Sequence, residues 1–170
     1  FFDDVTRTVI PAPKCLLHGE WFSVASKIIL GWAREHSFHA YNPRTGKGLL
    51  RFALLRHLEG YLMLTLVVNG GRLSGTDGLY EKLCEKFDKV SLYTCENKTA
   101  GSGVLTGKIR LVAGEERLNG EMLGIKFGLS PDSFFQGNER IKSAVVIPIP
   151  LKQSTTFFAS DSLIISKTSE

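Results

Sequence analysis

The sequence predicts an α+β domain, in which an antiparallel sheet carries two helices and a β-hairpin extension. Apolar residues recur at helical spacing in two segments and form runs of strand length in several others. Turn-forming Gly, Asn and Pro residues separate these segments. The order helix, strand, strand, helix, strand lacks only a leading strand to become the split βαβ pattern of a ferredoxin-like sheet.

Two segments are predicted to be amphipathic helices. The first covers residues 22–36, and the second begins near Thr76 or Asp77, either of which could cap it. In each segment the apolar side chains fall on one face, which should pack against the sheet. The first face contains Ala25, Ile28, Ile29, Trp32, Ala33 and His36, and the second contains Leu79, Tyr80, Leu83, Cys84 and Phe87.

The strands are predicted from short apolar or alternating runs. Residues 49–57 and 61–68 are separated by only three residues, so they should form an antiparallel hairpin. A further strand is expected at 90–96. Beyond a glycine-rich bend, strand-like sequence resumes at 104–112, turns around 113–114, and ends in the alternating strand 125–129. Phe1 looks like an internal point of a longer chain, which would explain the missing leading strand.

The chain divides into two regions by sequence character. Residues 1–138 carry the predicted helices and strands. Residues 139–170 contain Pro148 and Pro150 within an apolar run and many scattered Ser and Thr residues, without sustained periodicity. We expect residues 139–170 to form an extended tail.

Composition favours a soluble protein with an anionic partner. The net charge is +4 and the pI is about 9.0, but the basic residues are spread along the chain, so nucleic acid is permitted rather than indicated. The longest apolar run, 61–68, has the length of a strand and not of a membrane span. Cys15, Cys84 and Cys95 form no C-x-x-C pair, which favours a reducing, cytoplasmic location.

Two short patterns suggest sites but are better explained otherwise. His36 and His39 have a spacing that could bring two imidazoles to one metal, but no third ligand is close in sequence and the pair falls at a helix end. The tripeptide Asn97-Lys98-Thr99 matches a glycosylation acceptor, which needs a secretory context that nothing else supports. We therefore expect neither a metal site nor a glycan.

A turn with adjacent aromatic and amide side chains follows the strand 125–129. Phe134 and Phe135 offer flat faces for stacking a base, and Gln136 and Asn138 offer donors and acceptors for base edges, ribose hydroxyls or a cofactor. The alternative is that the rings plug an edge of the core while the amides satisfy the turn backbone. Residue chemistry alone favours this packing role.

The same turn carries the most specific motif of the chain, S-P-x-x-F-x-Q-x-N. Upstream, residues 40–57 contain an aromatic-Asn turn, the pattern G-x-L-R and a strand that ends in Arg, and "LTLVVNG" follows. In these features residues 1–138 resemble the S-adenosylmethionine-dependent RNA uracil-5 methyltransferases, which make 5-methyluridine in ribosomal and transfer RNA. The motif residues are Ser130, Pro131, Phe134, Gln136 and Asn138.

The resemblance implies roles for single residues. Gln136 matches a glutamine that contacts the S-adenosylmethionine cofactor, Phe134 matches an aromatic on the RNA side of the active site, and Asn138 would also face the RNA. Cys15 matches the last ligand of an iron-sulfur cluster that many members carry. The other three cluster cysteines would precede Phe1, so Cys15 alone should hold no cluster.

The resemblance also implies that the catalytic residues lie outside this chain. Residues 139–170 do not match the family's Rossmann-like domain, which supplies the nucleophilic cysteine and the general base, so the chain alone should be inactive. The leading interpretation is a central domain that orients rRNA or tRNA, with a companion chain possible for catalysis. The alternatives are a stand-alone RNA- or protein-binding module and an inactive truncated product.

Overall fold

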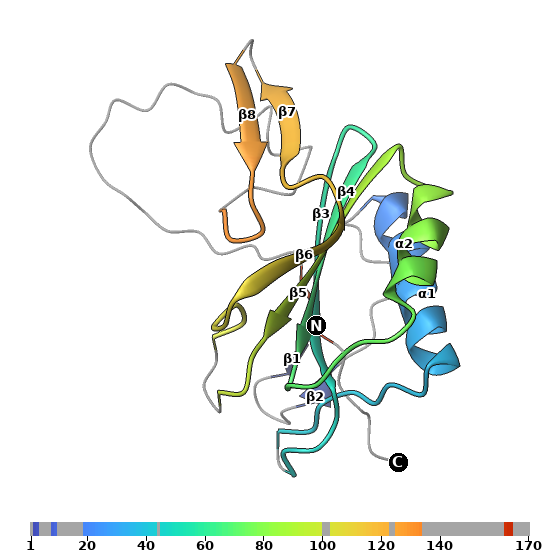
Figure 1. Cartoon of the computed structure of the whole chain (residues 1–170), viewed down its shortest axis with the longest axis vertical. Coiled ribbons are helices and arrows are strands. Elements are labelled where there is room, and N and C mark those ends of the chain that lie inside the picture. Colours follow the sequence, from blue (N-terminus) through green and yellow to red (C-terminus); the bar gives the residue numbers. More distant parts are fainter. Residues whose placement is uncertain are drawn as a thin grey trace, which may run out of the picture.

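The computed structural model describes residues 2–3, 8–9, 19–43, 45–99, 103–122, 125–133 and 162–164. Figure 1 shows a twisted sheet with two helices along one side and a separate hairpin at one end. The helices are α1 (Glu20–Glu35) and α2 (Thr76–Cys84). The strands are β1 (Phe2–Asp3), β2 (Thr8–Val9), β3 (Leu50–Leu58), β4 (Tyr61–Val68), β5 (Lys89–Glu96), β6 (Ile109–Gly114), β7 (Leu118–Met122), β8 (Ile125–Leu129) and β9 (Ser162–Ile164).

The main sheet has the strand order β6-β5-β4-β3-β9, and β1-β2 and β7-β8 form two-stranded sheets of their own. The predicted hairpin of β3 and β4 is present, with Leu58 opposite Tyr61 and a register shift near Phe52. Outside this hairpin, β4 and β5 are parallel, while β5-β6 and β3-β9 are antiparallel. The α+β class predicted from the sequence is confirmed.

The topology differs from the split βαβ pattern in one respect. In that pattern a leading strand would lie between β4 and β5, but these two strands are directly hydrogen-bonded along their whole length, from Tyr61 opposite Lys89 to Val68 opposite Glu96. The unit β4-α2-β5 is therefore an ordinary parallel crossover. β4 is buried at every position, as expected for a central strand covered on both faces.

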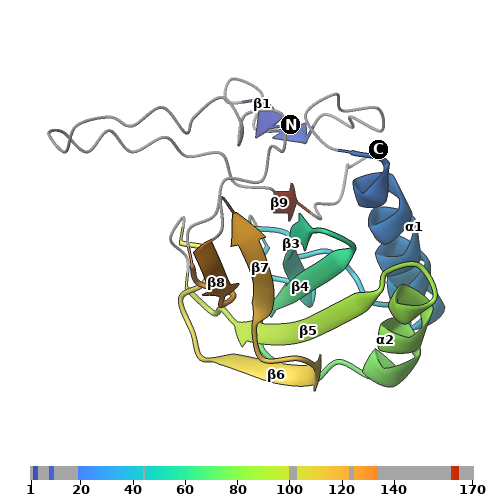
Figure 2. The same ribbon diagram turned by 90° about the horizontal axis from the view of Figure 1, so that it is seen from above.

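The helices cover one face of the sheet and form the larger core. Figure 2 shows α1 and α2 side by side on the same side of the strands. The apolar faces of the helices pack against alternate residues of the central strands. One buried layer between helices and sheet therefore explains both the helical and the strand periodicity of the sequence. The fully buried members with the largest side chains include Ile29, Trp32, Leu50, Leu55, Leu62, Leu64, Leu66, Leu79, Leu83 and Leu92.

The opposite face carries a smaller core that includes residues of the hairpin β7-β8. Leu118 and Leu129 from the hairpin are buried against Leu58, Met63 and Tyr93 of the sheet. The segment between β6 and β7 is held by three hydroxyl groups that donate to consecutive backbone carbonyls. These bonds are Ser91 Oγ to Glu115 O (2.5 Å), Tyr93 Oη to Glu116 O, and Tyr61 Oη to Arg117 O (3.0 Å).

Two local predictions for α2 are wrong. The N-cap of α2 is Gly75 in the left-handed region (φ 65°), with no side-chain cap from Thr76 or Asp77. Trp32 Nε1 donates to Gly75 O (2.9 Å), and the His36 ring fills the space that a side chain at Gly75 would need. Cys84 is exposed, because Leu83 takes the buried place in the last turn of the helix.

The predicted turn at 113–114 is instead the end of β6. Gly114 (φ 86°) pairs with Ser91, and a Cβ at Gly114 would lie 1.9 Å from Val90 O. The glycine therefore permits a close approach of two strands rather than a reversal of the chain. In the residues that the structure describes, no helix is long and apolar enough to span a membrane. Of the predicted tail 139–170, only β9 lies within the described residues.

Candidate functional site

The first part of the S-P-x-x-F-x-Q-x-N motif forms a tight, internally bonded turn at the end of β8. Ser133 N donates to Ser130 O (3.1 Å), and Ser130 N donates to Ser133 Oγ (3.1 Å). The two hydroxyls are also 2.7 Å apart, and Pro131 between them is buried. The segment that follows therefore leaves the hairpin from a fixed conformation.

Arg56, near the end of β3, holds this turn to the main sheet. Its Nη1 donates to Pro131 O and lies 3.5 Å from Ser130 O, while Nη2 donates to Ser133 O (2.8 Å). A guanidinium group suits this task because its donors form a rigid planar fork. The bonds join segments more than seventy residues apart in the chain. We refer to Arg56 with residues 130–133 as the Arg56 turn.

The only acidic group of the Arg56 turn is Asp132, which is exposed. Ser130 Oγ donates to Asp132 Oδ1, and this hydrogen bond is the main reason that the pKa of Asp132 lies below its usual value. The charges of Arg56 and Arg117 lower this pKa further. Asp132 therefore stays ionised at neutral pH and faces solvent beside the start of the motif.

The site residues predicted from the sequence continue from this turn. Phe134, Gln136 and Asn138 lie just beyond Ser133, outside the described residues, and Cys15 also lies outside them. Their roles thus remain predictions. Residue chemistry did not predict the contact of Arg56 with this turn, because no local sequence pattern reveals a partner so distant along the chain. The sequence singled out Arg56 only as the arginine that ends a family-like strand.

A second arginine of β3 forms a comparable network at the other end of the strand. Arg51 is buried, and its Nη1 donates to Asn97 O (2.8 Å) and Thr99 O (2.8 Å) and lies 3.2 Å from Asn97 Oδ1. Asn97 Nδ2 in turn donates to Gly103 O (2.7 Å) and Val104 O (2.9 Å). We call this set the Arg51 network. Asn97 is fully buried, which fits a structural amide and not a glycan acceptor.

The described residues do not form a metal site. Within them, no group of three His, Cys, Asp or Glu side chains could hold an ion. His36 packs against Trp32 and Phe38, and its Nδ1 lies 3.0 Å from Trp32 O, so it completes the end of α1. Cys84 and Cys95 are free cysteines on different elements, so these two thiols do not fit an iron-sulfur cluster, which needs several convergent thiolates.

The Arg56 turn by itself offers few groups to a cofactor. The carbonyls of the Arg56 turn are bonded to the guanidinium and its hydroxyls to one another, which leaves the turn with few free groups for a ligand.

The described residues form an α+β unit. No protein-family model matches the chain. An uncharacterized RNA methyltransferase of Listeria monocytogenes is 24% identical over 140 residues, and another from Caldanaerobacter subterraneus is 29% identical over 146 residues. Each alignment covers 81% of this chain but only 31% and 32% of the relative. The chain therefore spans about a third of the length of the curated relatives it matches.

One solved structure shares the fold. The tRNA (uracil-54, C5)-methyltransferase of Pyrococcus abyssi, solved in complex with S-adenosyl-L-homocysteine, superposes with a TM-score of 0.67 at 22% identity. The match covers 81% of this chain and 33% of that protein. The resemblance to RNA methyltransferases predicted from the sequence is confirmed by these relatives.

Proposed function

We propose that this chain is the central, RNA-facing part of an S-adenosylmethionine-dependent methyltransferase that forms 5-methyluridine in tRNA or rRNA. The observation that carries the proposal is the Arg56 turn, which anchors the start of the S-P-x-x-F-x-Q-x-N motif to a sheet whose fold matches a tRNA uracil-5 methyltransferase. Curated relatives named RNA methyltransferases support the same reaction class.

In this proposal the chain positions substrates and a separate domain performs the chemistry. S-adenosylmethionine would supply the methyl group. Gln136 would contact the cofactor, and Phe134 and Asn138 would face the RNA. The segment that carries them follows Ser133, which is bonded to Arg56. The catalytic residues would come from a domain or companion chain that continues the methyltransferase. The free thiols Cys84 and Cys95 are consistent with a reducing, cytoplasmic location.

A domain exchange tests this proposal directly. Residues 1–138 would replace the matching third of the Pyrococcus abyssi enzyme, and labelled methyl transfer to tRNA would be measured together with the modified nucleoside after nuclease digestion. We expect 5-methyluridine from the chimera and no product from the 170-residue chain alone.

The matched control is the same chimera with Gln136→Ala, which should raise the KM for the cofactor while leaving RNA affinity unchanged. A folded chimera that binds both substrates and forms no 5-methyluridine would contradict the proposed reaction. Robust methyl transfer by the 170-residue chain alone would contradict the division of labour between this domain and a catalytic one.

A further inference from the structure

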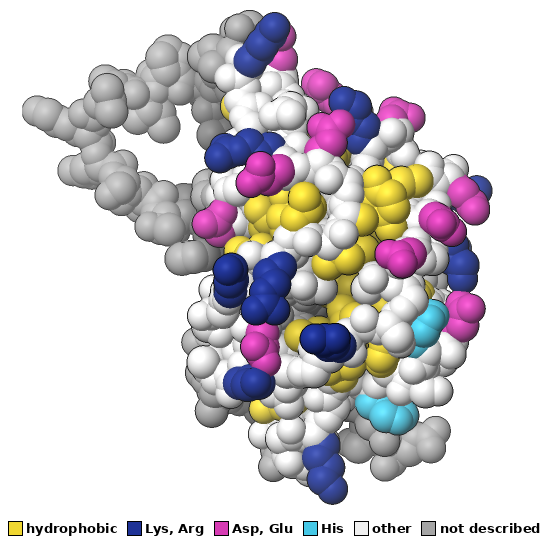
Figure 3. Space-filling model, in the orientation of Figure 1, with side chains coloured by type: hydrophobic (Ala, Val, Ile, Leu, Met, Phe, Trp, Pro, Cys, Tyr) yellow, Lys and Arg dark blue, Asp and Glu magenta, His cyan; other side chains and the backbone are white. Residues whose placement is uncertain are grey.

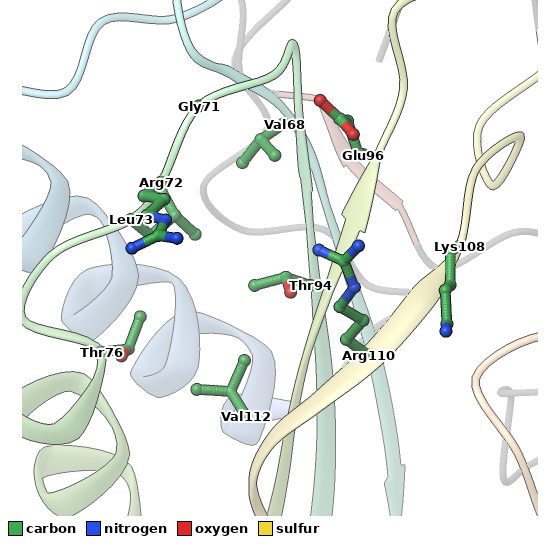
Figure 4. Close-up of a pocket in the computed structure, with 10 residues that line it drawn as sticks. All are labelled: Val68, Gly71, Arg72, Leu73, Thr76, Thr94, Glu96, Lys108, Arg110 and Val112. Carbon is green, nitrogen blue, oxygen red and sulfur yellow. The ribbon is translucent and has the colours of Figure 1, made fainter.

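A basic hollow lies on the helix-bearing side of the sheet, away from the Arg56 turn. It has a volume of about 390 Å³ and is bounded by the loop between β4 and α2 on one side and by β5 and β6 on the other. Figure 4 shows Arg72 on the loop side and Arg110 and Lys108 on the strand side. Figure 3 shows Lys and Arg side chains around exposed apolar surface on this face of the molecule. We call it the Arg72 hollow.

The positive charge of the Arg72 hollow is only partly compensated. Within the described part of the chain, Arg72, Lys108 and Arg110 form no ion pair at salt-bridge distance. The one carboxylate of the lining, Glu96, is engaged by Lys98 at 2.6 Å. That hydrogen bond is the main cause of the lowered pKa of Glu96, and the nearby charge of Arg110 contributes to it. Three cationic groups thus line one concave surface that contains a single carboxylate, Glu96, so the hollow carries a net positive charge.

The local backbone presents these side chains rather than burying them. Gly71, with φ 87°, turns the chain at the end of β4 so that Arg72 is exposed at the rim. β6 is an edge strand of the main sheet. Arg110 within β6 and Lys108 just before it are exposed, and Val112 is 37% exposed. Charged residues on an edge strand also discourage pairing with other sheets. That explanation does not account for Arg72, which comes from a different element.

We propose that the Arg72 hollow binds the phosphodiester backbone of the substrate RNA, through Arg72, Lys108 and Arg110, as a contact separate from the motif that follows the Arg56 turn. This inference rests on the proposed function, because it takes RNA as the partner. Among the described lining residues none is aromatic, so the hollow offers charge to phosphates and no surface on which bases could stack. It would set the orientation of the RNA without reading its sequence.

The experiment measures RNA affinity by fluorescence anisotropy with the 170-residue chain. The probe is a labelled RNA stem-loop with uridines in its loop, and the variant carries Arg72→Gln, Lys108→Gln and Arg110→Gln together. A contact with a single-stranded phosphate contributes about 0.7 to the slope of log affinity against log salt, or about fivefold in affinity near 0.1 M salt. We expect the triple variant to bind about 100-fold more weakly, with a salt slope lower by about 2.

The matched control carries Lys27→Gln, Lys47→Gln and Lys86→Gln, which remove the same charge from exposed positions outside the hollow. It should stay within about threefold of the parent chain. A second variant, Arg72→Lys with Arg110→Lys, keeps the charge and should bind nearly as well as the parent, which separates loss of charge from loss of folding. Circular dichroism and thermal melting check that every variant is folded.

Several results would overturn this inference and leave the proposed function standing. Equal losses in the hollow and control variants would show that net charge alone governs binding. Competition by polyglutamate as effective as that by RNA would identify an acidic protein partner instead. Absence of RNA binding at low salt would also contradict it, while 5-methyluridine formation by the chimera would still decide the proposed reaction independently.

Discussion

The two ends of β3 are each held by an arginine, but the two arginines do different work. Arg51 is 7% exposed and binds the backbone of the segment that follows β5, within the same sheet. Arg56 is half-buried and binds the turn after β8, which belongs to a separate hairpin. Arg51 thus joins two parts of the main sheet region, whereas Arg56 joins the main sheet to the turn at which the S-P-x-x-F-x-Q-x-N motif begins.

The two arginines differ in the burial of the hydrogen-bond acceptors that would lose their donor if the arginine were removed. The acceptors of Arg51 include Asn97, which is fully buried and has no access to water. The hydrogen bonds of Arg56 are partly buried, and two of its acceptors belong to the half-buried Ser130 and Ser133, where water can replace the guanidinium. Global stability should therefore depend mainly on the Arg51 network, and local order at the motif mainly on the Arg56 turn.

The largest expected effect is that of Arg51→Ala. The substitution removes charge-assisted hydrogen bonds and leaves the buried Asn97 carbonyl without its guanidinium donor, so we expect a loss of about 3 kcal/mol in the free energy of unfolding. Chemical denaturation followed by circular dichroism measures it. Lys27→Ala on the exposed face of α1 should change stability by less than about 0.5 kcal/mol. A similarly small change for Arg51→Ala would remove the distinction between the two arginines.

Arg56→Ala should cost less overall, about 1–2 kcal/mol, because its acceptors can bind water. Its main effect should be local: amide hydrogen exchange at Ser133 should accelerate at least tenfold while exchange in β4 remains unchanged. Arg56→Lys should restore only part of the protection, since an ammonium lacks the planar fork that spans Pro131 and Ser133. Uniform acceleration across the sheet would contradict a local role.

Tyr61→Phe tests whether the hairpin β7-β8 is attached to the main sheet by a second set of hydrogen bonds, independent of those of Arg56. It removes the hydroxyl that donates to Arg117 O and contacts Ser91 Oγ, at an expected cost of about 1 kcal/mol. Double substitution with Arg56→Ala should be close to additive if the two anchors are independent. A coupling energy above about 1 kcal/mol would show that the two anchors act as one unit.

The raised pKa of Tyr61 predicts that the protein loses stability at alkaline pH. Burial raises the pKa of Tyr61 above its ordinary value near 10, and the pKa of Tyr93 is raised for the same reason. Since the fold favours the protonated phenols, their contribution is complete below the unfolded pKa and is lost as the pH rises through the folded value. Denaturation midpoints should therefore fall above pH ~10 in the parent chain, and fall less steeply in Tyr61→Phe.

The smallest expected effect is that of Ser130→Ala at the Arg56 turn. Loss of the Ser130 hydroxyl removes the main cause of the low pKa of Asp132, so this pKa should move toward its ordinary value, as measured by NMR titration of the carboxyl carbon. The ionised form is favoured in the fold, so its small contribution is present above the unfolded pKa and disappears as the pH falls through the lower folded value. No shift in Ser130→Ala would show that charge, not the hydroxyl, sets this pKa.

The sequence predicted well those elements whose signal is local. The apolar run 61–68 is β4 to the residue, and the alternating run at 125–129 is β8. α1 begins two residues earlier and ends one residue earlier than its predicted span of 22–36. These successes share a cause: one face or both faces of a single element are buried, so periodicity reports burial directly.

Features that depend on distant partners could not be predicted in this way. The direct pairing of β4 with β5 depends on where α2 packs, and the roles of Arg51 and Arg56 depend on carbonyls 46 and 75 residues away. The Arg72 hollow likewise combines residues of a loop with those of an edge strand. In each case the relevant residues become neighbours only after the sheet has formed.

The complete burial of β4 has a consequence for the newly made chain. Its eight residues are largely apolar, uncharged and without proline, which are the properties of segments that self-associate into cross-β aggregates when exposed. Its first partner, β3, precedes it by a two-residue turn, so the β3-β4 hairpin can form as soon as both strands are available. Its other edge stays open until β5 arrives, and that interval is when the protein is most at risk of aggregation during synthesis.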